Sequence, residues 1–249
     1  MEAQGSIVYE AGVQTVNFVQ TKSLRLGLLL FVPRQYAERS DWPVIVFLHG
    51  AGESGSDPNK VALQGPPRLV QTNPDFPFVV VSPQNSAGRG GFSGTMAAAV
   101  AELVELLPRE LSTDPRRVYL TGVSMGGFGT WSVASTFPHL FAAIAPICGG
   151  GDTSSVVENL KQMPVWVWHG ANDVVIPVRE SDKLVDALRK ARPHHPELVK
   201  YTRLEHAPGH DEQWAAAGIP EMPGHASWVP AYKIDSELWN WFLDHSKSE

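Results

Sequence analysis

Short apolar runs recur along the chain, separated by polar and glycine-rich stretches. Continuous rather than alternating apolar character over four to six residues is typical of a strand buried on both faces. A more alternating strand is predicted over 199–204, and one or two further strands within 14–32. The continuous runs are 44–48, 78–81, 118–121, 142–147 and 165–168.

Helical periodicity appears between these runs. One apolar stripe with the spacing i, i+3, i+4, i+7 predicts an amphipathic helix. Further helices are predicted over 125–136, where Phe137-Pro138 ends the pattern, and around 184–188 and 238–242. Strands that alternate with helices predict an α/β fold, with a mostly parallel central sheet flanked by helices on both faces. The stripe consists of Val100, Leu103, Val104 and Leu107.

Composition places the chain among globular proteins. Its 249 residues are 43% hydrophobic and 18% charged, which predicts one α/β domain over 1–249. The net charge of −6 argues against nucleic-acid partners, and no apolar run is long enough for stable membrane insertion. A single cysteine, Cys148, and an N-terminus without secretory character favour the cytoplasm. A secreted protein that had lost its signal would look the same, and the sequence leaves the oligomeric state open.

The segment 122–126 reads Gly-Val-Ser-Met-Gly. It follows a predicted strand and precedes a predicted helix, which is the setting of a G-x-S-x-G nucleophile elbow. Glycines suit this motif because the serine occupies a strained turn where neighbouring side chains would clash. Ser124 is therefore the candidate nucleophile, and a tight structural turn that happens to contain serine is the alternative.

A serine hydroxyl needs a base, usually a histidine oriented by a carboxylate, and in this fold the chain order is serine, acid, histidine. Asp173 follows the strand 165–168 and is the preferred acid, with Asp152 as the reserve. Two glycine-preceded histidines, His210 and His225, compete as the base. The residues alone leave this choice open.

The backbone N–H groups of Met125 and Ala51 are the candidate oxyanion hole, with Gly52 next in line. Gly52, Phe128 and Trp228 are candidates for the substrate pocket, although core packing is the common role of aromatic residues.

Other titratable residues have structural interpretations. His49 and His169 are expected to bond loop backbone, and Cys148 to pack in the core. Pro208 and Gly209 separate His206 from His210 and exclude a helical zinc pair, so we expect no metal or organic cofactor.

The chain resembles the α/β-hydrolases, and among them compact carboxylesterases and phospholipase-like hydrolases related to feruloyl esterases and polyhydroxybutyrate depolymerases. In that family the catalytic histidine precedes a small residue, Ser-Trp, and then Ala-Tyr; 224–232 matches this pattern, and 210–214 matches only its opening. The resemblance therefore favours His225 over His210 and makes 211–223 an insertion and a possible small lid. The matching segments are 47–53, 65–67, 81–84, 117–127, 145–152 and 168–173.

Together these features predict a serine hydrolase that cleaves small-molecule carboxylic esters of small to medium acids through an acyl-enzyme. A phospholipase or a thioesterase would use the same groups. The alternative from another class is a ligand-sensing protein that keeps the hydrolase fold.

Overall fold

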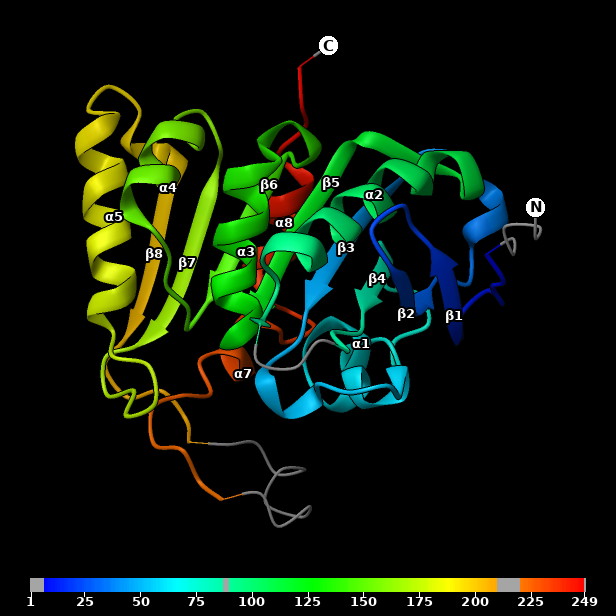
Figure 1. The fold of residues 1–249 in the computed structure, drawn as a ribbon, viewed down its shortest axis with the longest axis horizontal. Coiled ribbons are helices and arrows are strands. Elements are labelled where there is room, and N and C mark those ends of the chain that lie inside the picture. The colour runs from blue at the N-terminus through cyan, green and yellow to red at the C-terminus, as the bar shows by residue number, and fades with distance from the viewer. Residues whose placement is uncertain (1–6, 87–89, 210–219, 249) are drawn as a thin grey trace.

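An eight-stranded sheet runs through the part of the chain that the computed structural model describes, residues 7–86, 90–209 and 220–248 (Figure 1). The strand order is β1-β2-β4-β3-β5-β6-β7-β8. Their bounds are β1 Gln14–Gln20, β2 Arg25–Phe31, β3 Trp42–Leu48, β4 Val79–Pro83, β5 Thr113–Val123, β6 Ala143–Ile147, β7 Val165–Gly170 and β8 Val199–Leu204.

The strands from β3 to β8 are parallel to one another, as predicted. The β1–β2 hairpin is antiparallel, and β2 also joins β4 in antiparallel fashion. One or two strands were expected within 14–32; the structure has two, and they form an antiparallel edge on a parallel sheet. The predicted fold class is confirmed.

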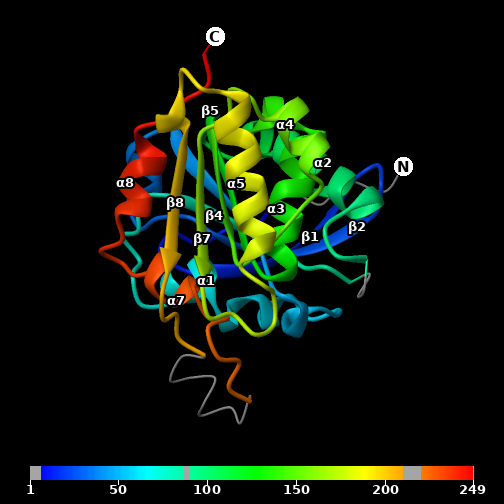
Figure 2. The ribbon, with the colours of Figure 1, turned by 90° about the vertical axis from the view of Figure 1, so that its left-hand side faces the viewer.

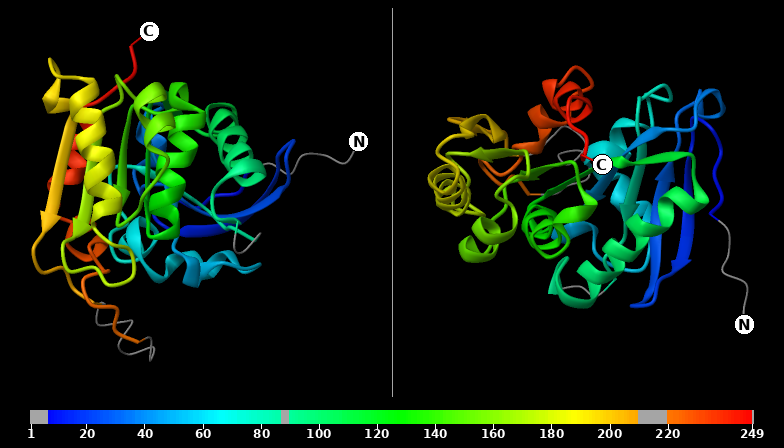
Figure 3. Two further views of the ribbon diagram at one scale, coloured as in Figure 1. Left: turned by 60° about the vertical axis from the view of Figure 1, so that its left-hand side comes forward. Right: turned by 90° about the horizontal axis from the view of Figure 1, so that it is seen from above.

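Helices cover both faces of the sheet, as Figures 2 and 3 show. The alternation of side chains in β3 supplies both cores: Val44, Val46 and Leu48 face one side, while Ile45 and Phe47 face the other. The first face carries α2 (Gly94–Glu110), α3 (Met125–Thr136), α4 (Thr153–Asn159) and α5 (Arg179–Ala191). The second face carries α1 (Gly65–Leu69), α7 (Trp228–Ala231) and α8 (Glu237–Leu243).

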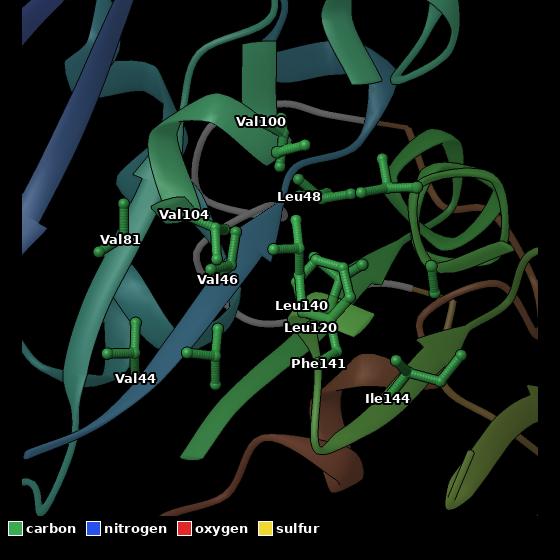
Figure 4. Close-up of a cluster of buried hydrophobic side chains, with 14 of the residues drawn as sticks. Val44, Val46, Leu48, Val81, Val100, Val104, Leu120, Leu140, Phe141 and Ile144 are labelled. Carbon is green, nitrogen blue, oxygen red and sulfur yellow. The ribbon is translucent and has the colours of Figure 1, made fainter. Parts of the chain in front are cut away.

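The core on the first face packs β-branched and leucine side chains of the sheet against the predicted stripe of α2. Figure 4 shows Val100 and Val104 of that stripe beside Val46 and Leu48 of β3. All four side chains are buried. The stripe therefore faces the sheet, as its spacing predicted.

The short helices were not predicted. α1, α4 and α7 have five, seven and four residues, too few to repeat an apolar stripe. Short 3₁₀ helices occupy 36–38, 51–53, 58–63, 138–140 and 196–198. None of the helices described is long and apolar enough to cross a membrane.

The loops that follow the parallel strands gather at one edge of the sheet, the lower edge in Figure 1. This edge receives the segment after β3, Ser124 after β5, Cys148 after β6 and Asp173 after β7. Residues 211–219 of the predicted lid 211–223 lie outside the described residues, and so does His210. On either side of residues 210–219 the described chain is in contact: the Met222 N–H donates to the Gly209 carbonyl at 3.0 Å.

Candidate active site

Ser124 occupies a sharp turn between β5 and α3. Its φ of 54° and ψ of −115° are unusual for a residue with a side chain. A side-chain carbon on Gly126 would collide with the Leu48 carbonyl, and one on Gly122 would collide with the carbonyl of Gly126. Gly126 is therefore needed because the turn approaches the backbone of β3 closely, and Gly122 is needed because it approaches the carbonyl of Gly126.

Three residues from distant parts of the chain meet at this turn. His225 Nε2 lies 3.0 Å from Ser124 Oγ, and His225 Nδ1 lies 2.8 Å from Asp173 Oδ2. Because a carboxylate only accepts, Nδ1 donates its hydrogen to Asp173 and Nε2 is left to accept the serine proton. The side chains of His225 and Asp173 are buried.

The reserve acid has a different place. Asp152 is the N-cap of α4, where its Oδ1 accepts the Ser155 N–H at 2.8 Å. This contact is the common structural use of an aspartate at a helix start. The competing histidine, His210, lies outside the described residues.

Two glycines bring the acid loop and the histidine loop into contact. A side-chain carbon on Gly224, whose φ is +76°, would collide with the backbone of Asn172 and Asp173. One on Gly170 would collide with the Gly224 carbonyl. The Val174 N–H also donates to the Pro223 carbonyl at 3.2 Å. The glycine before His225 is therefore a close-approach position that its sequence could have signalled.

Hydrogen bonds keep Asp173 ionised. Burial by itself would raise the pKa of this carboxyl, but hydrogen bonds from His169, His225 and the Ile176 N–H hold its pKa well below the usual range. Oδ1 accepts the N–H groups of Val175 and Ile176 at 2.8 and 2.9 Å. Both oxygens are therefore occupied, and the carboxylate has a fixed orientation.

His169 contacts the predicted acid, Asp173, which its sequence position did not suggest. As expected, it bonds loop backbone: Nε2 lies 2.9 Å from the Ile176 carbonyl. The same nitrogen also lies 3.3 Å from Asp173 Oδ2, and Nδ1 lies 2.7 Å from Ser181 Oγ. Sequence reasoning missed the contact with the acid, because a strand residue gives no sign of which loop its ring will touch.

The two predicted oxyanion donors come from different loops: Ala51 follows β3, and Met125 follows Ser124 at the end of β5. Ala51 and Met125 are the first residues of their helices, where a backbone N–H has no helical acceptor. His49 Nδ1 lies 2.6 Å from the Gly50 carbonyl, and Nε2 accepts the Asn85 N–H at 2.9 Å. Burial lowers the pKa of His49 to about 4, so Nδ1 carries the hydrogen that Gly50 accepts.

This contact also orients the Ala51 amide. The carbonyl and N–H of a trans peptide point in opposite directions in one plane. Holding the Gly50 carbonyl therefore fixes the direction of the Ala51 N–H. His49 does bond loop backbone, as predicted, and the bond is to the peptide that carries the predicted oxyanion donor, the Ala51 N–H.

A buried carboxyl group, which the sequence did not predict, stabilises the loop after β3. Glu53 is 3% exposed, and burial raises its pKa. Its Oε2 accepts a hydrogen bond from Gln64 at 2.7 Å, and its backbone carbonyl accepts one from Gln84. These residues come from three separate segments, so only the fold brings them together.

The predicted pocket residues differ in exposure. Gly52 is exposed and has open space around it, and Phe128 is 37% exposed. Trp228 is buried, with its ring perpendicular to that of His225 at a centroid distance of 5.4 Å. It restrains the histidine ring, and its part in substrate binding stays a prediction.

Among the described residues, one set of metal-type ligands comes together: Cys148, Asp173 and His225, with ligand atoms within 4.8 Å of one another. A metal ion there would have to break the bonds from His225 to Asp173 and Ser124. Cys148 is buried with a φ of 38°, and burial raises the pKa of its thiol. These properties fit the predicted packing role better than metal binding.

The fold and the site together define an α/β-hydrolase, as the resemblance predicted. The sequence pattern of the dienelactone hydrolase family matches residues 82–217, and the chain belongs to this family.

Two sequence relatives are larger proteins. The chain is 31% identical over 151 residues to a bifunctional acetylxylan esterase/xylanase from Neocallimastix patriciarum, covering 59% of this chain and 21% of that protein. It is 32% identical over 121 residues to poly(3-hydroxyalkanoate) depolymerase C from Paucimonas lemoignei, covering 43% and 28%. The chain thus spans about a quarter of the length of these relatives.

Solved structures show the same architecture. A thermostable esterase superposes with a TM-score of 0.72 at 32% identity, covering 94% of this chain and 63% of that one. The feruloyl esterase module from Clostridium thermocellum gives a TM-score of 0.62 at 13% identity, covering 82% and 89%. At that lower identity the likeness concerns the fold alone.

Proposed function

We propose that this protein is a serine hydrolase that cleaves carboxylic esters. The observation that carries the proposal is the 3.0 Å contact between His225 Nε2 and Ser124 Oγ, with Asp173 on the other ring nitrogen. Similarity to an acetylxylan esterase, a polyhydroxyalkanoate depolymerase and a thermostable esterase supports ester chemistry.

In the proposed reaction Ser124 Oγ attacks the ester carbonyl while His225 Nε2 takes the hydroxyl proton. The Met125 and Ala51 N–H groups bind the oxyanion of the tetrahedral intermediate. Each such donor is worth about 3 kcal/mol of transition-state stabilisation. Asp173, held ionised by its hydrogen bonds, stabilises the imidazolium that forms.

Collapse of the intermediate breaks the ester bond, and His225 gives its proton to the departing alcohol. A water molecule then attacks the acyl-enzyme, with His225 as the base again, and releases the acid. The sequence of steps uses no metal and no organic cofactor. We propose esters of small to medium acids as substrates.

A covalent trap and a substrate series test this proposal. A fluorophosphonate should label the wild-type protein on the peptide that contains Ser124 and leave Ser124→Ala unlabelled. Wild type should hydrolyse p-nitrophenyl esters, and its rates from acetate to laurate would define the acyl length. Labelling of another serine would overturn the assignment, and labelling without turnover would favour the ligand-sensing alternative.

We further propose that the protein acts in the cytoplasm, a reducing compartment. This proposal rests on the single cysteine, Cys148, which is buried and offers no accessible thiol for a disulfide. Recovery of the native protein from culture medium rather than from the cell lysate would contradict this placement.

A further inference from the structure

Gly50, the residue before the predicted oxyanion donor Ala51, is hydrogen-bonded by two buried side chains. The His49 ring donates to its carbonyl, with Nδ1 2.6 Å from the oxygen. The Glu53 carboxyl accepts its N–H. Both hydrogen-bonding groups of Gly50 are therefore engaged, and its backbone is extended, with a φ of −75° and a ψ of 176°. The two peptide groups that flank Gly50 are thus both held.

A side chain at position 50 would displace this arrangement. A side-chain carbon on Gly50 would lie 3.0 Å from Glu53 Oε2 and 3.2 Å from Gln64 Nε2. Glycine has more backbone freedom than any other residue, so without further contacts the peptide after Gly50 could turn. The bond to Glu53 fixes the peptide before Gly50, and the bond to His49 fixes the one after it. The Ala51 N–H belongs to the second peptide, so its direction depends on both bonds.

Glu53 is itself fixed by residues from two other segments. Its Oε2 accepts the Gln64 amide at 2.7 Å, and its backbone carbonyl accepts the Gln84 amide. Both glutamines are buried. Burial also raises the pKa of Glu53, because it disfavours the charged form of the carboxyl. A buried carboxyl costs stability compared with an apolar side chain of the same size, so stability alone does not explain its presence.

The loop that follows β3 packs against both chain neighbours of the proposed nucleophile, Ser124. A side-chain carbon on Gly50 would lie 3.8 Å from Cγ2 of Val123, which precedes the nucleophile. Ser54 Oγ lies 4.0 Å from Sδ of Met125, which follows it. The loop therefore lies beside the place where an ester carbonyl would be attacked, and a change in its shape changes where its N–H groups point.

We propose that Glu53 is a positioning residue for the oxyanion hole. Its carboxyl oxygen holds the Gly50 N–H, and this contact directs the Ala51 N–H toward the carbonyl oxygen of an ester at Ser124. Because a negative charge nearby opposes a developing oxyanion, the site requires an acceptor at this distance and not a charge. The inference rests on the proposed function, because it takes Ser124 as the nucleophile and the Ala51 N–H as an oxyanion donor.

Conservative substitutions separate the reach of the side chain from its charge. Glu53→Gln keeps the length and an acceptor oxygen for the Gly50 N–H. Gln64 Oε1 has no hydrogen-bond partner within the described parts of the chain, so the Gln64 amide can turn over and accept from the new amide. Glu53→Asp keeps the charge but is one methylene shorter, and Glu53→Met removes the acceptor. We expect Glu53→Gln to retain most of the wild-type kcat.

Glu53→Asp and Glu53→Met should lower kcat and kcat/KM for p-nitrophenyl acetate together, by about 10- to 100-fold, with KM unchanged. The loss is smaller than for complete removal of a donor, because a donor that has turned away keeps part of its effect. An unchanged KM marks an interaction made only in the transition state. Glu53→Asp as active as wild type, or Glu53→Gln as slow as Glu53→Met, would overturn the proposal.

Glu102 provides a matched control, because its carboxylate also accepts a backbone N–H. Its Oε2 accepts the Ser23 N–H at 3.0 Å, in the hairpin between β1 and β2 at the edge of the sheet. Glu102→Met should lower the free energy of unfolding in urea and leave kcat unchanged. If Glu53→Met behaves in the same way, Glu53 has a structural role only and the proposal is wrong.

A transition-state analogue and a covalent probe separate this proposal from the proposed function. A phenylboronic acid forms a tetrahedral adduct with a nucleophilic serine, so its inhibition constant should rise about 10- to 100-fold in Glu53→Asp and stay near wild type in Glu53→Gln. The rate of fluorophosphonate labelling of Ser124 should fall in Glu53→Asp by a similar factor. Labelled wild type that hydrolyses no ester would remove the proposed function, and the labelling rates would still test Glu53. Ester hydrolysis that needs Ser124, with labelling of Glu53→Asp at the wild-type rate, would remove only the role of Glu53.

Discussion

Asp173 and Asp152 are the same residue type, and their hydrogen-bond partners give them different roles. Both aspartates follow a parallel strand in a polar loop, so the sequence could rank them only by position. Asp173 accepts from two backbone N–H groups and faces two histidine rings, whereas Asp152 caps a helix. The first arrangement is the one that the proposed base, His225, requires, and the second stabilises α4.

Replacing each aspartate by asparagine should separate these roles. Asp173→Asn disturbs the charge and the tautomer of His225, and we expect kcat for p-nitrophenyl acetate to fall on the order of 10⁴-fold. Asp152→Asn keeps a good N-cap residue and should stay within about tenfold of wild type. Steady-state kinetics checks both values, and a larger loss in Asp152→Asn would reverse the assignment of the acid.

At the scale of elements, the sequence predicted the long segments well. The continuous apolar runs became β3 to β7, and α3 spans Met125–Thr136 as expected, because the elbow begins it and Pro138 follows its end. The short helices α1, α4 and α7 carry too few residues to repeat a pattern. The contacts of His49 and Glu53 join separate segments, and no local signal reports them.

The choice of histidine came from family resemblance and not from periodicity. Both candidates follow a glycine, and only the fold reveals that Gly224 must pass against the backbone of Asn172 and Asp173. His225 contacts both Ser124 and Asp173 in the structure. Its role as the base remains a prediction that needs the matched histidine variants.

The start of α3 packs so closely against the end of β3 that Gly126 should not tolerate an added side-chain carbon. Gly126→Ala would press a side-chain carbon into the Leu48 carbonyl, and backbone cannot yield as a flexible side chain does. We expect a loss of about 1–3 kcal/mol in the free energy of unfolding, together with reduced turnover. Urea denaturation and ester hydrolysis measure the two effects.

Gly52→Ala is the control, because an added carbon at Gly52 meets no atom within 4 Å. Its free energy of unfolding should stay within about 0.5 kcal/mol of wild type. Equal destabilisation of both variants would mean that the close approach of α3 and β3 is not what requires Gly126.

For the whole molecule, buried titratable groups set how stability depends on pH. Burial lowers the pKa of His49 from 6.5 to about 4, so in this interval the unfolded chain binds a proton that the folded protein does not. Stability therefore rises with pH across this interval. Asp173, whose folded pKa is depressed, adds stability that is present above its unfolded pKa of about 3.9 and is lost below it.

His49 should therefore contribute a distinct slope between pH 4 and 6.5. The full shift corresponds to about 3 kcal/mol in the free energy of unfolding. Urea denaturation of wild type at several pH values should show this rise, and His49→Gln, which cannot titrate, should show a flatter one. Parallel curves for the two proteins would contradict a buried neutral His49.

The central claim is that Ser124 and His225 form the reacting pair. The most direct measurement is turnover of p-nitrophenyl acetate by wild type, Ser124→Ala, His225→Ala and His210→Ala, with folding checked by circular dichroism. We expect losses on the order of 10⁶-fold for Ser124→Ala and His225→Ala, and less than about tenfold for His210→Ala. An inactive His210→Ala beside an active His225→Ala, or a fully active Ser124→Ala, would contradict the account.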